Sequence, residues 1–163
     1  MRAWRAEDAG SITPYAANLA VARNMRDIFP HPYTRADAEA FISSCISSSE
    51  ECQLCRAIAA GGRAVGGIAL VRGTDVYFRS AELGYWLAEE YWGRGIMTRA
   101  VERMCREAFA RWDIVRIYAE PFAYNTGSRR VLEKAGFVLE GIMRRGACKK
   151  APALFSGAYK GLQ

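Results

Sequence analysis

Apolar side chains in the first third of the chain recur at helical spacing in two stretches. Residues 11–26 predict a helix that begins near Pro14. A proline-braced loop follows, and a second helix is expected from Thr34, which is placed to cap it, with Asp37 three residues later. The apolar positions of this second helix are Ala38, Phe41, Ile42, Cys45 and Ile46. We therefore expect two helices before any strand.

The middle of the chain changes to strand-like patterning. Residues 52–73 contain two apolar runs joined by Gly61 and Gly62, which is the pattern of a β-hairpin. Residues 80–88 then predict a third strand with two different faces. One face carries Glu82, Gly84 and Trp86, and the other carries Leu83, Tyr85 and Leu87. Three consecutive strands indicate an antiparallel half of a sheet.

The next part of the chain alternates between helix and strand. Residues 98–112 place their apolar side chains in one helical stripe. Residues 114–122 predict a strand that stops at Pro121. A short helix is expected next, with Asn125 as its N-cap and Gly136 as its left-handed stop.

Two final strands are expected at Phe137–Arg145 and Leu154–Gly161. The predicted order is therefore α-α-β-β-β-α-β-α-β-β, an α+β sheet with a helical crossover after the third strand. The chain has 163 residues, of which 51% are hydrophobic, and neither a repeat nor a linker divides it. We expect residues 1–163 to form a single domain.

Composition excludes several classes of protein. No apolar run is long enough to span a bilayer and no charged-then-apolar leader is present, so we expect a cytoplasmic protein made without export. The five cysteines are an odd number and widely scattered, which argues against a disulfide framework. Cys52 and Cys55 stand at C-x-x-C spacing, but a zinc site needs a second ligand pair and the only histidine is His31. We expect reduced thiols and no metal.

The net charge leaves several partners open. The chain has 23 Lys and Arg against 17 Asp and Glu, a formal net charge of +6. After Glu140 there are five basic residues and no acidic one. Nucleic acid, a polyphosphate cofactor and an acidic surface would each explain this excess, and so would a solvated basic face.

One glycine turn is placed to hold an anion. In YWGRGIM, residues 91–97, the turn follows a strand and precedes a helix, where free backbone N–H groups and the helix dipole favour phosphate. Gly93 and Gly95 let the backbone approach the anion, and Arg94 adds positive charge. The pattern is neither a Walker loop nor a dinucleotide fingerprint, since Thr98 stands at the third glycine position. A plain tight turn would explain the turn on its own.

Three segments together resemble a known family. NTGSRRVLEKAGF, residues 125–137, resembles the corresponding segment of the GNAT superfamily of N-acetyltransferases. AELGYWLAEEYWGRGIMTRAV, residues 81–101, is similar to the fourth strand and acetyl-CoA loop of its ribosomal-protein N-terminal acetyltransferase (Rim-type) branch. NMRDIFPHPYTRADAEAFI, residues 24–42, is similar to the substrate-side segment of that branch. Departures from the family pattern are Met97, bulkier than usual in the loop, a first strand that is barely present, and a missing acidic residue in the last hairpin.

The resemblance implies a fold and a cosubstrate. The fold would be a mixed, largely antiparallel twisted sheet with helices on both faces, splayed between its fourth and fifth strands. Acetyl-CoA would bind with its pyrophosphate on the glycine turn and its pantetheine arm paired with the fourth strand, where a backbone N–H would polarise the thioester carbonyl. The residues implied to bind it are Tyr85, Trp86, Leu87, Trp92, Gly93, Arg94, Gly95, Ile96, Met97, Thr98, Asn125, Ser128 and Arg130.

The resemblance also implies catalytic positions. Ser128 falls where family members protonate or hydrogen-bond the departing CoA thiolate, although a first-turn hydroxyl would explain it structurally. The acceptor amine needs a base, and because no histidine lies near the motifs, Glu82 and Glu120 are the candidates. Each could equally be an ion-paired surface glutamate. The substrate mouth would be formed by Phe29, His31, Tyr33 and Glu82, unless Phe29 and Tyr33 only pack the loop.

The predicted function is therefore direct transfer of an acetyl group from acetyl-CoA to a primary amine, either a protein N-terminus or a small amine. Nothing suggests a nucleophilic Cys–His pair, as expected for transfer within a ternary complex. The alternative is a catalytically silent module that senses acyl-CoA. We rank a nucleic-acid-binding protein last, because the basic segment lacks interleaved aromatic platforms. The acceptor and a homodimeric state stay open.

Overall fold

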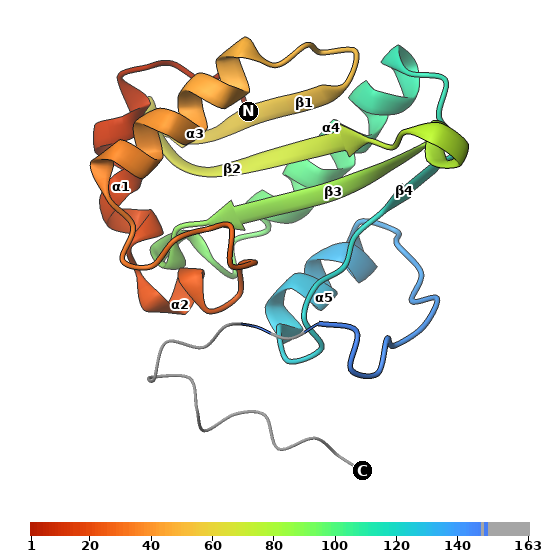
Figure 1. Cartoon of the computed structure of the whole chain (residues 1–163). Helices are drawn as coiled ribbons and strands as arrows, with labels where there is room; N and C mark the ends of the chain where they lie inside the picture. The colour runs from red at the N-terminus through yellow and green to blue at the C-terminus, as the bar shows by residue number, and fades with distance from the viewer. Residues whose placement is uncertain (148, 150–163) are drawn as a thin grey trace.

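The computed structural model describes residues 1–147 and Lys149. Over this part of the chain three helices precede three strands, and a helix, a short strand and a last helix follow (Figure 1). In chain order these are α1 (Asp8–Ala16), α2 (Leu19–Ala22), α3 (Arg35–Ser47), β1 (Gln53–Ala60), β2 (Arg63–Arg72), β3 (Ser80–Leu87), α4 (Ile96–Arg111), β4 (Arg116–Tyr118) and α5 (Thr126–Lys134).

The strands form one mixed sheet in the order β1-β2-β3-β4. β1 pairs with β2 and β2 with β3 in antiparallel register, while β4 joins β3 in parallel. Arg2 forms an isolated antiparallel bridge with Ala57, where a first strand is expected, so β3 and β4 are the fourth and fifth strands of the predicted fold. The mixed, largely antiparallel sheet is confirmed.

β3 and β4 stay together for only three residue pairs. The parallel register joins Ser80 to Arg116, Ala81 to Ile117 and Glu82 to Tyr118. Beyond Glu82 the two strands diverge, and the rest of β3 pairs with β2 alone. The predicted splay between these strands is therefore present, and α5 lies beside it (Figure 1).

Helices cover both faces of the sheet, as predicted, with α1 and α3 on one face and α4 on the other (Figure 1). On the α4 face, Val101 and Met104 are fully buried in one apolar cluster with strand residues such as Leu70. On the opposite face, Ile12 of α1 and Ile42 of α3 belong to a second buried cluster. This burial of two apolar layers against one sheet is what holds the cleft-forming strands in place.

The hydrogen bonds of the predicted helix caps are present in the structure. Thr34 Oγ1 accepts the Asp37 N–H at 3.3 Å, and Asp37 Oδ2 accepts the Thr34 N–H at 2.8 Å, so α3 begins with a reciprocal capping box. Asn125 Oδ1 accepts the Ser128 N–H at 3.0 Å at the start of α5. Gly136 ends that helix with φ of 89°. The local signals in the sequence therefore set these helix ends.

The first helix begins earlier than predicted. α1 begins at Asp8 and contains Pro14, and a separate short helix, α2, follows with Asn18 as its cap. The start is fixed by a carboxylate, since Asp8 receives two hydrogen bonds from the Arg2 guanidinium at 2.6 and 2.7 Å and one from the Arg5 N–H at 3.0 Å. The prediction of a helix starting near Pro14 was wrong because it ignored this ion pair.

The strand predicted at Phe137–Arg145 is also wrong. The structure has no strand over these residues, and Val138 and Leu139 are 84% and 62% exposed. Glu140 binds the Arg116 guanidinium of β4 at 2.6 Å, so this segment meets the sheet edge through side chains and not through a backbone ladder. The strand predicted at Leu154–Gly161 lies outside the described residues.

Within residues 1–147 and 149, no helix combines the length and apolarity that a membrane crossing requires. The same part of the chain contains no group of three or more His, Cys, Asp or Glu side chains that could hold a metal ion. Cys52 is exposed just before β1, whereas Cys55 is buried within β1, and both thiols are free. The two cysteines at C-x-x-C spacing therefore lie just before β1 and within it.

Candidate active site

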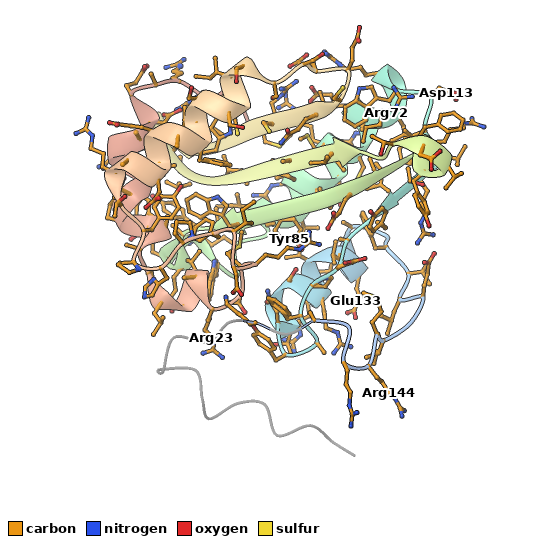
Figure 2. The ribbon with its side chains drawn as sticks, viewed as in Figure 1. Arg23, Arg72, Tyr85, Asp113, Glu133 and Arg144 are labelled. Atoms are coloured by element: carbon orange, nitrogen blue, oxygen red, sulfur yellow. The ribbon has the colours of Figure 1, made fainter. Side chains whose placement is uncertain are left out.

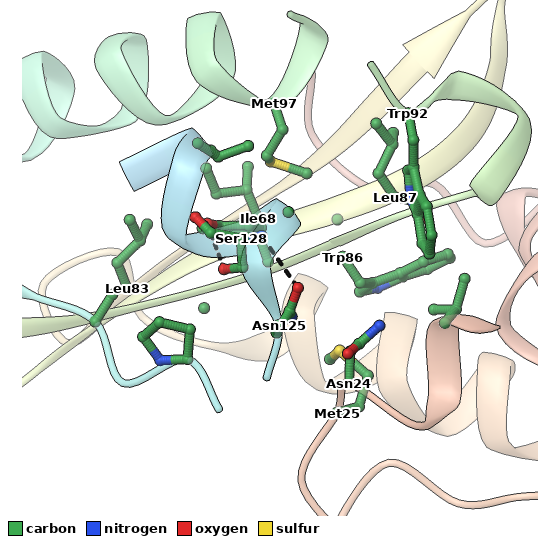
Figure 3. A pocket seen from close by; sticks show the side chains of 18 of the residues that line it. Asn24, Met25, Ile68, Leu83, Trp86, Leu87, Trp92, Met97, Asn125 and Ser128 are labelled. Carbon is green, nitrogen blue, oxygen red and sulfur yellow. Dashed lines mark hydrogen bonds between the residues drawn. The ribbon is translucent and has the colours of Figure 1, made fainter. Parts of the chain in front are cut away.

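A cleft of about 1020 Å³ opens where β3 and β4 diverge. Its walls come from β3, the turn before α4, the start of α5 and the loop after α2, which Figure 3 shows from close by. Most residues predicted to bind acetyl-CoA line it, namely Tyr85, Trp86, Leu87, Trp92, Gly93, Gly95, Ile96, Met97, Thr98, Asn125, Ser128 and Arg130. Arg94 does not, because its guanidinium lies over the Tyr91 ring, 5.4 Å from the centroid.

The turn before α4 forms one end of the cleft. Gly93 and Gly95 have φ of 74° and 69°, in the left-handed region that side chains other than glycine rarely adopt. Gly95 is the N-cap of α4 and no side chain caps the first amides of this helix. The 16-residue α4 therefore points free N–H groups and the positive end of its dipole towards the cleft. This geometry suits an anion.

Trp92 ties this turn to β3. Its indole Nε1–H donates to the carbonyl of Leu87, the last residue of β3, at 2.8 Å. Half of the Trp92 side chain still faces solvent, and it lines the cleft near Leu87 (Figure 3). Trp92 therefore fixes the spacing between the free edge of β3 and the glycine turn.

β3 is held rigidly behind the cleft. Trp86 is buried, and its ring meets that of Phe29 edge-on at 6.0 Å. Gly67 on β2 makes room for it, because a Cβ there would lie 2.9 Å from the Trp4 ring and 3.2 Å from Trp86 Nε1. The backbone that lines the cleft is thus fixed from the α1 and α3 face of the sheet.

Ser128 lies in the first turn of α5 with its hydroxyl engaged. Its N–H is capped by Asn125, and its Oγ lies 2.8 Å from the Tyr85 hydroxyl of β3. The Tyr85 hydroxyl also donates to the Ser128 carbonyl at 3.2 Å. Figure 2 places Tyr85 between β3 and α5. Burial raises the pKa of Tyr85 to about 12, against a smaller opposite effect of the bond to Ser128, so the phenol is neutral at physiological pH.

The other end of the cleft is charged. Glu82 of β3 and Glu120 after β4 both line it, and the Arg26 guanidinium pairs with both, at 3.5 Å in the case of Glu120. All three side chains are between 30% and 56% exposed. Burial, together with these two carboxylates, raises the pKa of Tyr118, the register partner of Glu82. Sequence reasoning found the carboxylates but missed Arg26.

The predicted substrate residues divide into two groups. Phe29 lines the cleft and stacks on Tyr33, with ring centroids 4.8 Å apart. Tyr33 is buried and does not line the cleft. Of the two roles considered for it, lining the substrate mouth or packing the loop, its position fits the second. His31 does not line the cleft either, and its Nδ1 is buried with no hydrogen-bond partner among the described residues.

Two contacts beside the cleft join segments far apart in the sequence. The Tyr124 hydroxyl donates to the Arg23 carbonyl, just after α2. Lys149 Nζ donates to the carbonyls of Ala22 and Met25 at 2.8 and 2.6 Å. Because the partners in each contact stand more than 100 positions apart, no local sequence signal could have found these contacts.

The amino-acid sequence matches a family of known proteins. The family described as acetyltransferase (GNAT) domain matches residues 1–138. The chain belongs to the GNAT family of acetyltransferases. The resemblance inferred from the three sequence segments is therefore confirmed, and the family match reaches from the N-terminus past the end of α5.

Curated relatives of this GNAT protein match it in part. The protein named "Probable N-acetyltransferase YjcK" of Bacillus subtilis (strain 168) is 40% identical over 87 residues, which is 53% of this chain and 48% of YjcK. The "Ribosomal-protein-serine acetyltransferase" of Escherichia coli (strain K12) is 30% identical over 67 residues, 41% of this chain and 37% of that protein. The chain thus matches about half or less of the length of these relatives.

Solved structures share the fold of this GNAT protein. The ribosomal alpha-N-protein acetyltransferase RimL, solved with coenzyme A, superposes with a TM-score of 0.79 at 20% identity, covering 91% of this chain and 85% of RimL. Mycobacterium smegmatis RimJ, solved with a CoA disulfide, gives a TM-score of 0.74 at 26% identity, covering 90% and 73%. The sheet, its splay and the surrounding helices are therefore those of the GNAT fold.

Proposed function

We propose that this GNAT protein transfers the acetyl group of acetyl-CoA directly to a primary amine within a ternary complex. One observation carries the proposal: a single cleft joins the glycine turn before α4 to the splay between β3 and β4, where a hydroxyl and two carboxylates lie. The similar folds of RimL and RimJ, both solved with forms of coenzyme A, support it.

The residues present suit acetyl-CoA. A Cβ at Gly93 would meet nothing within 4 Å, so the turn is open to a bulky anion, and the amides of Ile96, Met97 and Thr98 would hold the pyrophosphate. Arg130 lines the same cleft and would add positive charge. The edge of β3 beyond Glu82 would pair with the pantetheine arm, as an added strand pairs with an open sheet edge.

The proposed reaction uses both ends of the cleft. Glu82 or Glu120, directly or through a water, would take a proton from the acceptor ammonium. The amine nitrogen would then bond to the thioester carbon, and a backbone N–H near Trp86 or Leu87 would stabilise the oxyanion. As the carbon–sulfur bond breaks, Ser128 Oγ would give its proton to the sulfur and take the second proton that the nitrogen loses on becoming an amide, and the carboxylate would return the first proton to solvent. Every proton then has a donor and an acceptor.

The acceptor end suits a cation. Two carboxylates and one guanidinium leave a net negative charge there, so an acceptor ammonium competes with Arg26 for Glu82 and Glu120. The name of RimL suggests a protein N-terminus and that of the Escherichia coli relative a ribosomal protein, while a small amine would meet the same charges. A cytoplasmic location and a homodimer stay predictions from the sequence.

A silent acyl-CoA sensor is the second candidate, and Arg26 is the observation that favours it. Both candidate bases pair with the Arg26 guanidinium, so neither carboxylate can take a proton from an acceptor amine without first giving up that contact. The two functions share the cofactor end of the cleft and differ only in whether an acceptor reacts.

The deciding experiment incubates the protein with acetyl-CoA and a panel of amines and N-terminal peptides, with free thiol recorded over time. The Gly95→Glu variant, which places a carboxylate in the turn, is the control. Thiol release that needs an acceptor and disappears in the control supports the transferase. Binding of acetyl-CoA without release for any acceptor favours the sensor, and failure to bind acetyl-CoA contradicts both.

A further inference from the structure

The role proposed for β3 uses its backbone, but the side chain of Tyr85 on this strand also hydrogen-bonds Ser128. We propose that Tyr85 is a positioning residue, whose hydroxyl orients Ser128 so that the serine hydrogen points at the sulfur of coenzyme A. The inference rests on the proposed function, because it concerns the group that would protonate the departing thiolate. It assigns a task to the Tyr85 side chain, separate from any pairing of its backbone with pantetheine.

The geometry leaves two rotations of the Ser128 side chain to be fixed. Its backbone is held by the bond from its N–H to Asn125 Oδ1 at 3.0 Å, so the first turn of α5 cannot shift freely. Only the torsion of the side chain and the direction of its O–H remain. Within residues 1–147 and 149, Tyr85 is the hydrogen-bond partner of Ser128 Oγ, at 2.8 Å. Tyr85 therefore controls where Oγ lies.

We assign Tyr85 as the donor of this hydrogen bond, in which either hydroxyl can donate. A phenol kept neutral by burial retains a proton that it can donate. Its two acceptors are Ser128 Oγ at 2.8 Å and the Ser128 carbonyl at 3.2 Å, so Oγ is the nearer. When Oγ accepts from Tyr85, the serine hydrogen is free to point elsewhere, and the cleft that Ser128 lines is the open side.

The fold explains why a β3 side chain can reach α5. Tyr85 stands three residues beyond Glu82, the last residue of β3 that pairs with β4. Beside this part of β3, where a longer β4 would pair with it, the splay leaves space that α5 fills. Leu132 of α5 belongs to the buried apolar cluster on the α4 face of the sheet. Tyr85 packs against this cluster and spans the gap (Figure 2). A positioning bond at this site is thus a product of the splay.

The test compares coenzyme A with desulfo-coenzyme A, which lacks the sulfur, by calorimetry between about pH 6.5 and about pH 9.5. As the bound thiol ionises, a hydroxyl directed at it favours coenzyme A over the desulfo form. In the wild type we expect this preference to grow by about tenfold across the range, the value of a hydrogen bond to a charged atom. No acceptor amine is needed, so the readout does not depend on turnover.

Three variants and one control separate positioning from packing. Ser128→Ala is expected to abolish the pH-dependent gain, and Tyr85→Phe, which keeps the ring, is expected to lose most of it. The double variant is expected to match Ser128→Ala, because Tyr85 acts through Ser128. Tyr77→Phe, which removes an exposed phenol on the turn between β2 and β3, is expected to behave as the wild type.

Two results would overturn the inference alone. One is a pH-dependent gain in Tyr85→Phe as large as that of the wild type. The other is a further loss of this gain when Tyr85→Phe is added to Ser128→Ala, as large as the loss in Tyr85→Phe alone, which would mean that Tyr85 acts on the sulfur directly. If neither coenzyme A nor its desulfo form binds the wild type, the proposed function fails and this inference fails with it. A drop in melting temperature without any change in the pH-dependent gain would show that Tyr85 only supports packing.

Discussion

The turn before α4 and the charged end of the cleft hold their shapes by different means. At the turn, glycines with φ of 74° and 69° and the uncapped start of a 16-residue helix present backbone N–H groups. At the other end, Arg26, Glu82 and Glu120 meet through flexible side chains that are partly exposed. The first end depends on backbone conformation, and the second depends on which charges are present and how water screens them.

This difference predicts how each end responds to mutation. A backbone site fails when its φ angles or its approach path are lost, and such losses are large. A site of exposed charges changes in small steps, because each ion pair contributes little and others remain. Substitutions that affect one end alone would sharpen the comparison, and one that affects both would break it.

Gly95→Glu should have the largest effect. A side chain at φ of 69° costs about 1 to 2 kcal/mol, and the added carboxylate repels the anion at the start of α4, so we expect about a hundredfold weaker binding of coenzyme A by calorimetry. Gly61→Glu in the hairpin, at φ of 56°, shares the backbone cost but lies outside the cleft. It should lower the melting temperature and leave the affinity unchanged; equal losses of affinity in both would contradict an anion site.

Trp92→Phe should have the next largest effect. It removes the indole donor to the Leu87 carbonyl, worth about 1 kcal/mol, so coenzyme A should bind about fivefold more weakly. Trp112→Phe is the matched control, because its indole donates to the Glu50 carbonyl at 2.9 Å away from the cleft. It should cost stability without changing affinity. Unchanged affinity in Trp92→Phe would mean that the turn keeps its place without this bond.

Arg26→Ala tests the charged end. Without the guanidinium an acceptor ammonium meets two free carboxylates, so the KM of a cationic acceptor should fall by up to about fivefold, while the affinity for coenzyme A stays constant. Arg35→Ala, which breaks an exposed pair with Glu39 on α3, should change neither quantity. A higher KM in Arg26→Ala would show that Arg26 orients the carboxylates and does not compete with the acceptor.

Asp8→Asn should change stability and leave both ends of the cleft as they are. Burial alone would raise the pKa of Asp8, but hydrogen bonds from Arg2 and the Arg5 N–H lower it below its ordinary value. The ionised group therefore stabilises the fold above the unfolded pKa of about 4, and this contribution is lost as pH falls through the lower folded pKa.

Thermal unfolding across pH checks this prediction. At neutral pH, Asp8→Asn should lose about 2 kcal/mol, and below about pH 4 the gap to the wild type should close. Asp113→Asn, which breaks the exposed pair with Arg79, is the control and should lie close to the wild type. A constant gap down to acid pH would mean that Asp8 acts by packing and not by charge.

The backbone-built parts of the molecule could be predicted from sequence because local residues specify them. The Thr34–Asp37 capping box, the Asn125 cap and the hairpin at Gly61 and Gly62 each depend on neighbours a few positions away. The turn at Gly93 and Gly95 belongs to the same class. These features also place most of the cleft-lining residues correctly.

The features that were missed depend on distant partners. Arg26 is an ordinary loop arginine until β3 and β4 bring Glu82 and Glu120 beside it. The start of α1 depends on Arg2, whose position is set by its bridge to Ala57 of β1. Apolar residues after Phe137 suggested a strand, yet that segment meets β4 through the Arg116–Glu140 ion pair.

The short pairing of β3 with β4 has a kinetic consequence. Amide protons between β2 and β3 are held along the whole of β3, whereas those facing β4 are held only from Ser80 to Glu82. In the free protein, amides on the open edge beyond Glu82 should exchange with deuterated solvent much faster than their neighbours across the same strand. A bound pantetheine arm would slow this exchange. The two edges of one strand would then report, residue by residue, on folding and on occupancy.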